Sequence, residues 1–382
     1  MIVGILKETF PGENRVAIVP TTVPSLQKAG FIVHVESGAG IQAGFPDKLY
    51  EDQGALISDR AEVFAKANVL LQIRAVGTNP KTDSDDIKAL KEGQIVIGLI
   101  DALTNAGAVK SLASSKVKAF ALELVPRITR AQAMDVLSSQ ANIAGYKAAL
   151  IAADSLPRML PMMMTAAGTM TPARILVIGA GVAGLQAIAT CNRLGAIVSA
   201  YDIRPAVKEQ VQSLGAKFVE LELETGESED KGGYAKAMDE EFYKKQRELM
   251  AKVVRENDAV ISTAAIPGKK APILITEEMV AGMKPGSVIV DLAAESGGNC
   301  ESTIAGETIM KDGVKIIGPV NVPSRVPYHA SQMYAKNIAN LLLLMVKDEE
   351  LNINLEDEIL KESLVTDGGN VVNERVKESL GL

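Results

Sequence analysis

The 382-residue sequence has no tryptophan, two histidines, two cysteines and an aromatic content of only 4%. So few aromatic side chains argue against stacking platforms for nucleic acid bases. The two cysteines, Cys191 and Cys300, lack the spacing of metal ligands, and Cys191 falls inside a predicted helix, where a buried thiol is the simpler interpretation. This sparing use of cysteine fits a reducing compartment.

Long hydrophobic runs and clusters of positive charge are also missing. The longest unbroken apolar run near the end of the chain, Leu341–Val346, is far too short to cross a bilayer. The first residues, Met1–Lys7, have no basic lead before their apolar run, which excludes a secretory signal. A net charge of −7 without a basic cluster argues against nucleic acid as a partner. We therefore expect a chain that is soluble by itself, which leaves docking on a membrane partner open.

What the sequence does contain is a glycine-rich turn between two apolar runs. The run Arg174–Ile178 leads directly into Gly179-Ala-Gly-Val-Ala-Gly184, a helical pattern covers Leu185–Leu194, and a second run, Ile197–Tyr201, ends at Asp202. A GxGxxG pattern alone is weak, because glycine-rich turns are common. Here a strand precedes it, a helix follows it, and an acid stands eighteen residues after the last glycine. This context favours a dinucleotide-binding βαβ unit.

Each position of this unit has a physical task. Gly179 permits the tight turn off the strand, Gly181 lets the backbone approach a pyrophosphate at the helix start, and Gly184 allows close packing of helix on sheet. Asp202 can accept both hydroxyl hydrogens of an adenosine ribose and would repel a 2′-phosphate, which favours NAD(H) over NADP(H). Arg204 leaves that preference open, because an arginine could hold the phosphate.

The rest of the chain alternates between strand-like and helix-like runs, which favours mostly parallel sheets covered by helices. Before the glycine turn, strands are predicted at Ile2–Leu6, Ile32–Val35, Val69–Ile73, Ile95–Ile100 and Val117–Leu122, and helices at Val23–Lys28, Ala61–Lys66, Ile87–Lys91 and Ala108–Ser114. After Asp202, strands at Lys217–Val219, Ala259–Ser262, Ser287–Asp291 and Val314–Ile317 give the glycine domain about six. The region before the turn has no glycine fingerprint, so it is expected to share the fold without binding a nucleotide.

A chain of this length should form two domains. We expect an α/β fold of two Rossmann-like, doubly wound parallel-sheet domains, the second inserted in the first. The first domain is predicted at 1–130 and 350–382, and the NAD(H)-binding Rossmann domain at 153–327. Linking helices are predicted at 131–152 and 328–349, on the helical patterns Gln132–Ala152 and Tyr328–Lys347.

The segment Leu221–Glu241 is unusually long and polar for a compact domain, with acidic residues around Gly226, Gly232 and Gly233. Long polar connections with glycine hinges often act as lids over a site. A solvated loop without function is the alternative, and Tyr234 beside the glycines favours the lid.

The usual groups for proton transfer are scarce. A dehydrogenase acting on an alcohol or amine needs a general acid or base near the nicotinamide, most often histidine or lysine. His34 lies within a predicted strand and His329 at the start of the late helix, where structural and capping roles are the simpler interpretations. Two histidines also cannot form a Ser-His-Asp arrangement or a metal-ligand cluster, although lysine bases stay possible.

A polar cluster, Arg127 to Ser138, lies where the two predicted domains meet along the sequence. Clefts between domains are preferred ligand sites. The arginine, glutamine, aspartate and serine of this cluster can hold a carboxamide and a ribose without transferring a proton. The same residues could instead cap and solubilise the following helix, and the pattern alone supports both interpretations equally.

Six separated segments resemble the NAD(H)-binding component of proton-translocating nicotinamide nucleotide transhydrogenase. They are Pro126–Ser139, Pro161–Gly168, Gly233–Lys236, Ile266–Gly268, Asp291–Cys300 and Val322–Arg325. The resemblance covers essentially the whole chain. It implies a component that binds NADH and passes a hydride to NADP⁺ on a separate NADP(H)-binding component, coupled to proton movement through a transmembrane component. Two nicotinamide rings exchange the hydride directly, so no protein acid or base is required and the scarcity of histidine is accounted for.

The resemblance also implies site residues and partners. Seven residues would hold the nicotinamide and its ribose. Four of them would also have roles in hydride transfer: Arg127, Gln132, Asp135 and Ser138. The other three, Ile128, Thr129 and Arg130, would contact the cofactor. Gln132 would also reach toward the partner's nucleotide. The remaining cofactor-binding residues would be Gly179, Ala180, Gly181, Val182 and Gly184 at the pyrophosphate, Asp202, Ile203 and Arg204 at the adenosine, Gly233 and Tyr234 in the mobile loop, and Gln246 and Ala265 in the same cleft.

The resemblance further implies a homodimer, peripheral on the cytoplasmic face of the inner or plasma membrane, or on the matrix side in mitochondria. Ala265 stands where a bulkier apolar residue is usual in the family, which affects packing alone.

Two other functions stay open. Alanine dehydrogenase is related in fold and also carries an arginine like Arg15. Its pattern needs a histidine in the region of Ile97–Ala102 and a substrate lysine where Ala75 follows Arg74, and this sequence has neither. Arg15 is therefore expected to have a structural role. A non-catalytic NAD(H) sensor would bind the nucleotide through the same residues without transferring a hydride.

Overall fold

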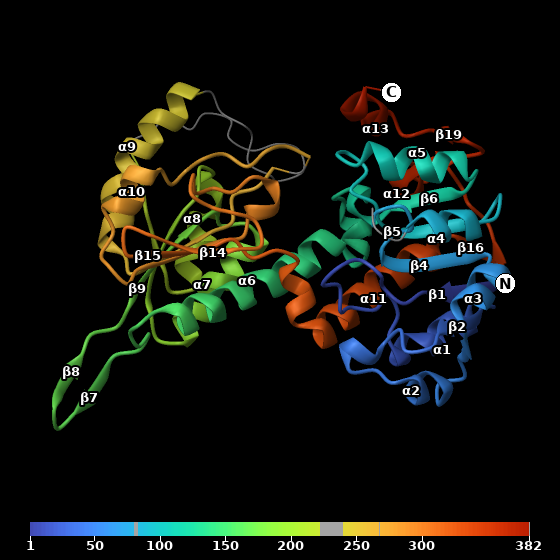
Figure 1. The fold of residues 1–382 in the computed structure, drawn as a ribbon, viewed down its shortest axis with the longest axis horizontal. Helices are drawn as coiled ribbons and strands as arrows, with labels where there is room; N and C mark the ends of the chain where they lie inside the picture. The colour runs from blue at the N-terminus through green and yellow to red at the C-terminus, as the bar shows by residue number, and fades with distance from the viewer. Residues whose placement is uncertain (80–82, 222–239, 267, 382) are drawn as a thin grey trace. The chain divides into compact units, whose positions relative to one another are not determined.

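The computed structural model describes residues 1–79, 83–221, 240–266 and 268–381. The chain divides into two compact units: unit 1 comprises Met1–Gln140 and Ser324–Leu382, and unit 2 comprises Ala141–Pro323 (Figure 1). Unit 2 is thus inserted between two segments of unit 1. Each unit contains a sheet rich in parallel strands, so the predicted fold class of two doubly wound α/β domains, one inserted in the other, is confirmed.

The sheet of unit 1 has eight strands in the order β19-β18-β6-β5-β4-β1-β2-β3. Its strands are β1 (Ile2–Ile5), β2 (Ile32–Glu36), β3 (Leu56–Ser58), β4 (Val69–Arg74), β5 (Ile95–Leu99), β6 (Lys118–Ala121), β18 (Leu364–Asp367) and β19 (Asn370–Val371). The first six run parallel, and β18 and β19 add an antiparallel edge from the tail of the chain.

Helices cover both faces of this sheet. They are α1 (Val23–Lys28), α2 (Asp47–Glu51), α3 (Arg60–Lys66), α4 (Asp83–Ala89), α5 (Ala106–Ser114), α11 (Pro327–Leu344), α12 (Glu358–Ser363) and α13 (Glu374–Leu380). Leu70 and Leu71 are fully buried in different hydrophobic clusters, because successive side chains of a strand point to opposite faces. A two-stranded ribbon, β16 (Val346–Lys347) and β17 (Glu350–Leu351), follows α11.

The sheet of unit 2 has seven strands in the order β11-β10-β9-β12-β13-β15-β14. They are β9 (Arg174–Ile178), β10 (Ile197–Tyr201), β11 (Lys217–Phe218), β12 (Ala259–Ser262), β13 (Val288–Asp291), β14 (Thr308–Lys311) and β15 (Val314–Ile317). Its helices are α7 (Val182–Arg193), α8 (Lys208–Ser213), α9 (Glu240–Glu256) and α10 (Glu277–Ala281). The strand order reverses between β9 and β12, which is where doubly wound sheets bind their ligands.

Three local predictions need correction. Among the described residues, the main sheet of the glycine domain has seven strands, because the half-exposed edge strand β14 pairs antiparallel with β15. β3 of unit 1 was also missed, and it is only three residues long. The predicted helix from Gln132 instead begins as a 3₁₀ turn, Thr129–Met134, and the α-helix α6 spans Val136–Ser155.

The cause of this later helix start is the side chain of Asp135. Its Oδ1 atom accepts a hydrogen bond of 2.8 Å from the backbone N–H of Ser138, as expected of a residue that caps a helix N-terminus. The acid before the apolar run Val136–Leu137 was the sequence signal for this boundary.

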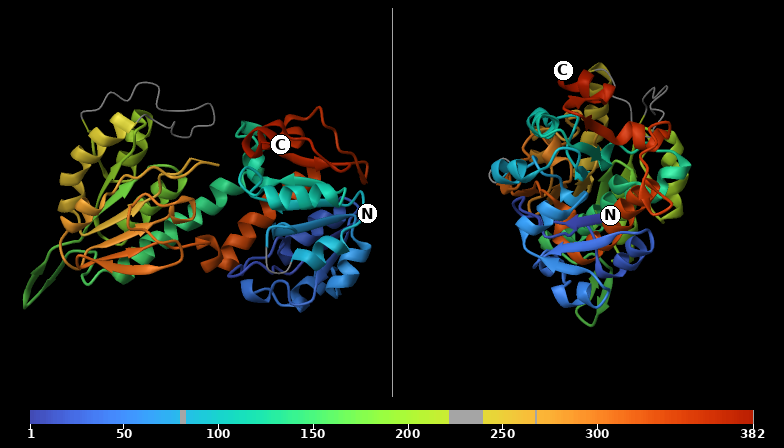
Figure 2. Two further views of the ribbon diagram at one scale, coloured as in Figure 1. Left: turned by 45° about the horizontal axis from the view of Figure 1, so that its top comes forward. Right: turned by 90° about the vertical axis from the view of Figure 1, so that its right-hand side faces the viewer.

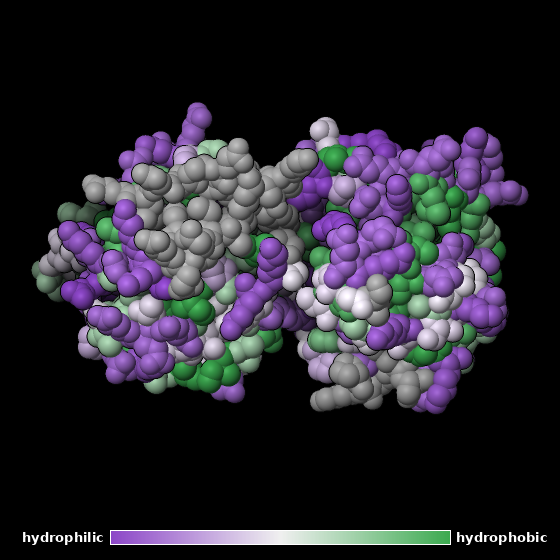
Figure 3. All heavy atoms as spheres, turned by 90° about the horizontal axis from the view of Figure 1, so that it is seen from above, coloured by the Kyte–Doolittle hydropathy of each residue, from purple (hydrophilic) through white to green (hydrophobic). Residues whose placement is uncertain are grey.

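A hairpin of β7 (Met163–Thr165) and β8 (Gly168–Met170) extends away from the rest of unit 2 (Figures 1 and 2). All of its strand residues are exposed. Large exposed apolar side chains gather on and beside it: Met159, Met162, Met163, Met164 and Met170. Elsewhere, the face shown in Figure 3 intersperses hydrophilic side chains with small hydrophobic areas. No helix within the described ranges is long and apolar enough to cross a membrane.

Candidate functional site

The glycine turn after β9 needs glycine at two of its positions for steric reasons. Gly179 has φ of +93°, and a Cβ there would lie 2.6 Å from the Thr263 hydroxyl oxygen. A Cβ on Gly184 would lie 1.8 Å from the carbonyl oxygen of Gly179. The turn and the first residues of α7 therefore pack too closely for any side chain, as the predicted roles of these two glycines require.

Gly181 differs, because a Cβ there would meet no atom of the described residues within 4 Å. This residue is the N-cap of α7, and no side chain within the described residues caps that helix. The free N–H groups at a helix start attract anions. The open space at Gly181 and the uncapped start of α7 therefore suit the pyrophosphate predicted to lie there.

The first turn of α7 also packs closely against α6. A Cβ on Gly145 would lie 2.0 Å from the carbonyl oxygen of Ala183. The glycine in α6 thus lets the two helices approach to backbone contact directly under the glycine turn.

Asp202 follows β10 and is already engaged. Its Oδ2 atom accepts the backbone N–H of Ala180 at 2.7 Å, and its Oδ1 atom accepts the backbone N–H of Arg204 at 2.9 Å. The Arg204 guanidinium donates from Nε to Oδ1 and from Nη2 to Oδ2, both at 2.9 Å. The structure brings the predicted ribose acceptor next to the glycine turn, and it pairs that acceptor with Arg204. This pairing of Asp202 with Arg204 was not predicted from the sequence.

Gln246, on α9, is buried beneath the end of β10. Its Nε2 atom donates to the Tyr201 hydroxyl at 2.7 Å, whereas its Oε1 atom finds no hydrogen-bond partner among the described residues. Ile203 packs partly buried against the same hydrophobic cluster as Tyr201. Ala265 is exposed in the loop after β12. Gly233 and Tyr234, and the predicted lid around them, lie outside the described residues.

The loop that carries Ala265 is fixed by a polar network that the sequence analysis missed. The Asp291 side chain, fully buried at the end of β13, accepts hydrogen bonds from Ser262, Thr303 and the N–H of Asn299, among others. Asn299 in turn bonds both the N–H and the carbonyl of Ala264. The signal was present in the Asp291–Cys300 segment, where an acid follows an apolar strand.

In unit 1, three residues of the Arg127–Ser138 cluster come together. The Ser138 hydroxyl donates to Asp135 Oδ2 at 2.6 Å and accepts from Arg127 Nη2 at 3.1 Å. Arg127 Nε lies 3.7 Å from the same carboxylate oxygen. All three side chains stay partly accessible. Gln132 and Thr129 are exposed, and Ile128 is half-buried.

Arg130 points elsewhere. Its guanidinium forms a two-pronged ion pair with Asp357, at 2.6 and 2.8 Å. The hydrogen bonds from Arg130 hold the pKa of Asp357 below its usual range. Arg130 thus ties the 3₁₀ turn to the N-terminus of α12, where Asp357 is the N-cap.

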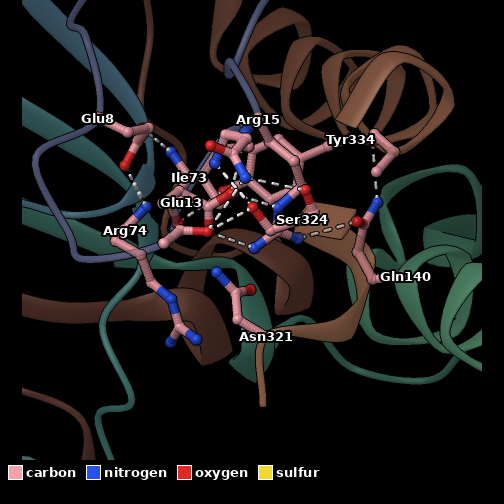
Figure 4. Close-up of polar contacts among 12 residues, drawn as sticks. Glu8, Glu13, Arg15, Ile73, Arg74, Gln140, Asn321, Ser324 and Tyr334 are labelled. Carbon is pink, nitrogen blue, oxygen red and sulfur yellow. Dashed lines mark hydrogen bonds and ion pairs between the residues drawn. The ribbon is translucent and has the colours of Figure 1, made fainter. Parts of the chain in front are cut away.

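A second polar cluster of unit 1 is buried after β1 (Figure 4). The Arg15 guanidinium donates to both carboxylate oxygens of Glu13, at 2.7 and 2.6 Å, and to Gln140 Oε1 at 2.9 Å. Glu8 accepts the backbone N–H groups of Ile73 and Arg74. Burial, reinforced by the nearby Glu13 charge, raises the pKa of Glu8 to about 8.

These contacts agree with the structural role expected for Arg15, whose exposed fraction is 3%. At the positions where alanine dehydrogenase would need its lysine and histidine, Ala75 is buried and Arg74 instead pairs with Asp101 at 2.8 Å. His34 is buried with its Nδ1 atom 2.9 Å from the Ser58 hydroxyl, and His329 is exposed.

Two family models match this chain. The model described as "Alanine dehydrogenase/PNT, N-terminal domain" matches residues 4–144, and the model described as "Alanine dehydrogenase/PNT, C-terminal domain" matches residues 148–374. Together they span most of the sequence. The chain therefore belongs to the alanine dehydrogenase/PNT family.

Within this family, the chain is more similar in sequence to transhydrogenases than to the alanine dehydrogenase structure compared below. The chain is 50% identical over 377 residues to the first portion of the NAD(P) transhydrogenase alpha subunit of Rhodospirillum rubrum, covering 98% of both chains. A crystal structure of transhydrogenase from Sinorhizobium meliloti has 48% identity and a TM-score of 0.88, covering 97% of this chain and 100% of that one. The resemblance to transhydrogenase is confirmed. An L-alanine dehydrogenase structure, with 23% identity, a TM-score of 0.83 and coverage of 100% and 99%, shares the fold.

Proposed function

We propose that this chain binds NADH and transfers its hydride directly to NADP⁺ held on a partner component of a NAD(P) transhydrogenase. The observation that carries the proposal is the glycine turn between β9 and α7, open at Gly181 and adjoined by the Asp202 carboxylate. The identity of 50% to a transhydrogenase subunit favours this activity over the others in the family.

The turn would bind the two phosphates through the backbone of Gly179, Ala180, Gly181 and Val182, with Gly184 keeping α7 close. Asp202 and Ile203 would hold the adenosine, with Arg204 beside them, and the carboxylate favours a ribose with a free 2′-hydroxyl, hence NAD(H) over NADP(H). The geometric support is the hydrogen bond from Ala180 to Asp202, which places the ribose acceptor beside the phosphate turn.

We assign the nicotinamide and its ribose to the Arg127–Ser138 cluster. Arg127, Asp135 and Ser138 are already oriented by their mutual hydrogen bonds, which suits them to hold the carboxamide and ribose in one pose. Gln132 is exposed, and we assign it to a contact with the second nucleotide. We also assign Ile128, Thr129 and Arg130 to the nicotinamide half of NADH, although the Arg130 guanidinium itself pairs with Asp357. In unit 2, Gln246 on α9 and Ala265 after β12 would complete the set, together with Gly233 and Tyr234, which lie outside the described residues.

Hydride transfer between two nicotinamide rings requires no protein acid or base, because the hydride leaves one ring as it joins the other and no proton moves. NADH and NADP⁺ become NAD⁺ and NADPH. Catalysis would then consist of holding the rings in contact, and positioning of this kind can contribute about 7–11 kcal/mol to lowering a barrier. The two histidines of the chain, one buried against Ser58 and one exposed, are not needed.

The proposed setting is a membrane complex with a NADP(H)-binding component and a transmembrane component that couples the transfer to proton translocation. The chain would lie at the cytoplasmic face of the inner or plasma membrane, or on the matrix side in mitochondria. We further propose a homodimer. Its support is the exposed hairpin β7–β8 with Met162 and Met164, which are 60% and 75% exposed and would gain from burial against a second copy.

The decisive experiment mixes this chain with a related NADP(H)-binding component and follows hydride exchange between NADH and an oxidised NADP analogue. We expect exchange that depends on both proteins. NADH binding without exchange would instead indicate a non-catalytic NAD(H) sensor. Robust NADH formation from NAD⁺ and alanine, with no partner present, would indicate an alanine dehydrogenase.

A further inference from the structure

The Asp202 carboxylate accepts four hydrogen bonds in this structure. Two come from backbone N–H groups, those of Ala180 and Arg204, and two come from the Arg204 guanidinium. A carboxylate offers about four acceptor positions on its two oxygens. Asp202 therefore has no acceptor position left for a ribose in this state.

The guanidinium occupies the positions that a ribose would use. It presents two donors side by side, Nε and Nη2, one to each carboxylate oxygen at 2.9 Å. The vicinal 2′- and 3′-hydroxyls of an adenosine ribose also present two adjacent donors that a carboxylate can accept as a pair. The two backbone N–H groups hold Asp202 from other directions. A ribose diol and the guanidinium thus compete for the same side of Asp202.

The competition is also steric. The side chains of Asp202 and Arg204 are only 5% and 10% exposed. A ligand therefore cannot reach the carboxylate by adding to the pair, and it must displace the guanidinium. The carboxylate itself stays in place, since Ala180 and the backbone of Arg204 hold it beside the glycine turn.

We propose that Arg204 is a specificity-determining latch, whose guanidinium fills the ribose-diol subsite on Asp202 until an unmodified ribose replaces it. This inference rests on the proposed binding of NADH at the glycine turn. It gives Arg204 a role opposite to that of a phosphate-binding arginine, because its guanidinium is committed to a carboxylate two residues away.

The latch accounts for discrimination against a 2′-phosphate. When a nucleotide with a free ribose diol displaces the Arg204 guanidinium, its two hydroxyls replace the two lost hydrogen bonds to Asp202. A 2′-phosphorylated nucleotide can replace at most one of them, and its phosphate places negative charge next to the carboxylate. Replacing Asp202 by asparagine removes that charge and releases the guanidinium, which then stands close enough to pair with the phosphate.

The first test measures binding of NADH, ADP-ribose and reduced nicotinamide mononucleotide to Arg204→Met by calorimetry. NADH and ADP-ribose should bind about tenfold more tightly than to the unmodified chain, the factor expected if the latch is closed nine-tenths of the time. Reduced nicotinamide mononucleotide, which lacks the adenosine ribose, should be unaffected. Weaker or unchanged ADP-ribose binding would overturn the latch.

Lys208→Met is the matched control. Lys208 lies on α8, four residues beyond Arg204, and pairs with Glu220 and not with Asp202. Lys208→Met removes one nearby positive charge and should leave the affinities for NADH and ADP-ribose unchanged. An equal gain in Lys208→Met would mean that general charge, and not the latch, set the affinity. Arg204→Lys keeps the positive charge but cannot donate the same pair of hydrogen bonds to Asp202. Its affinity for NADH and ADP-ribose should lie between those of Arg204→Met and the unmodified chain. Thermal unfolding of each variant identifies any that fail to fold.

The second test separates the latch from the proposed nucleotide site. Asp202→Asn should weaken NADH and strengthen NADPH binding, and adding Arg204→Met should abolish the gain for NADPH. If Asp202→Asn leaves NADH binding unchanged, the proposed site itself is wrong. If Asp202→Asn weakens NADH binding, but its affinity for NADPH is the same with and without Arg204→Met, the proposed nucleotide site is supported and the latch is refuted.

Discussion

The two units have matching strand neighbours but different turns at the same point. β1 lies between β2 and β4 in unit 1, and β9 lies between β10 and β12 in unit 2. After β9, the chain turns through glycines and leaves open space at Gly181. After β1, it turns through Glu8, Glu13 and Arg15, whose side chains satisfy one another and nearby backbone groups.

The difference shows how one topology yields an open turn, the proposed ligand site, in one unit and a closed structure in the other. A doubly wound sheet offers a crevice at the reversal of its strand order. In unit 1 that region holds a buried ion pair, which is costly to disturb because neither charge can reach water. In unit 2 the corresponding backbone has no side chains at two critical positions and keeps its helix start uncapped among the described residues.

The largest effect is expected from Gly184→Ala. Its Cβ would overlap the Gly179 carbonyl at 1.8 Å, so the turn must distort and NADH binding should be lost, with a lower melting temperature. Gly181→Ala is the matched control, since its Cβ enters open space. It should melt like the unmodified protein and still bind NADH more weakly. Thermal unfolding and NADH titration of both variants would test this, and similar melting losses in both would contradict the comparison.

Breaking the buried Arg15–Glu13 ion pair of unit 1 should lower the stability of the protein without affecting nucleotide binding. Arg15→Met removes the guanidinium that pairs with Glu13, a carboxylate at 7% exposure, and loss of one partner of a buried pair costs about 3–5 kcal/mol. Urea unfolding should report this loss, while NADH affinity of the folded protein stays unchanged. The double variant with Glu13→Gln should recover some of the stability. A large affinity loss in folded Arg15→Met would place Arg15 in the functional site.

Two substitutions at the proposed site should separate binding from transfer. Asp202→Asn should weaken NADH binding by roughly ten- to a hundredfold, because hydrogen bonds to a charged group contribute about 1.5–3 kcal/mol. Gln132→Asn should slow hydride exchange and leave NADH affinity nearly intact, since its exposed side chain is assigned to the partner's nucleotide. Fluorescence titration and exchange rates distinguish the two, and an equal affinity loss in both would refute the assigned roles.

The smallest effect concerns the exposed pair Arg130–Asp357. The pKa of Asp357 is lowered by Arg130, so the pair contributes stability above the ordinary pKa of the carboxyl, 3.8, and loses it as the pH falls through the lower folded value. Arg130→Met should slightly reduce stability at neutral pH and flatten the acid side of the stability profile. Urea unfolding from acidic to neutral pH measures this, and an unchanged profile would show that the pair contributes nothing.

Much of the sheet structure follows from apolar runs alone. The ranges Ala259–Ser262 and Val314–Ile317 match β12 and β15 residue for residue, because both strands are largely buried and have a neighbouring strand on each side. β14 and the hairpin β7–β8 were missed, because edge and exposed strands lack that signal. Their stability depends on a neighbouring strand, which a local pattern cannot show.

The candidate site was only partly predictable, for a similar reason. The glycines and Asp202 act through their own backbone or charge, and their spacing indicates a task. Whether Arg204 turns back onto Asp202 depends on the path of the chain after β10, where a short 3₁₀ turn begins at Pro205. The hydrogen bonds among Arg127, Asp135 and Ser138 likewise arise from a helix start that the sequence analysis placed four residues too early.

Gly145 supports the glycine turn, the proposed phosphate site, from outside the GxGxxG sequence. It lies 34 residues before Gly179 and matches none of the spacing rules by which such sites are found. Yet any larger residue there would push against Ala183 and tilt the amide groups that are meant to face the nucleotide. Variation at this remote position in α6 should therefore alter nucleotide affinity even in chains whose GxGxxG sequence is intact.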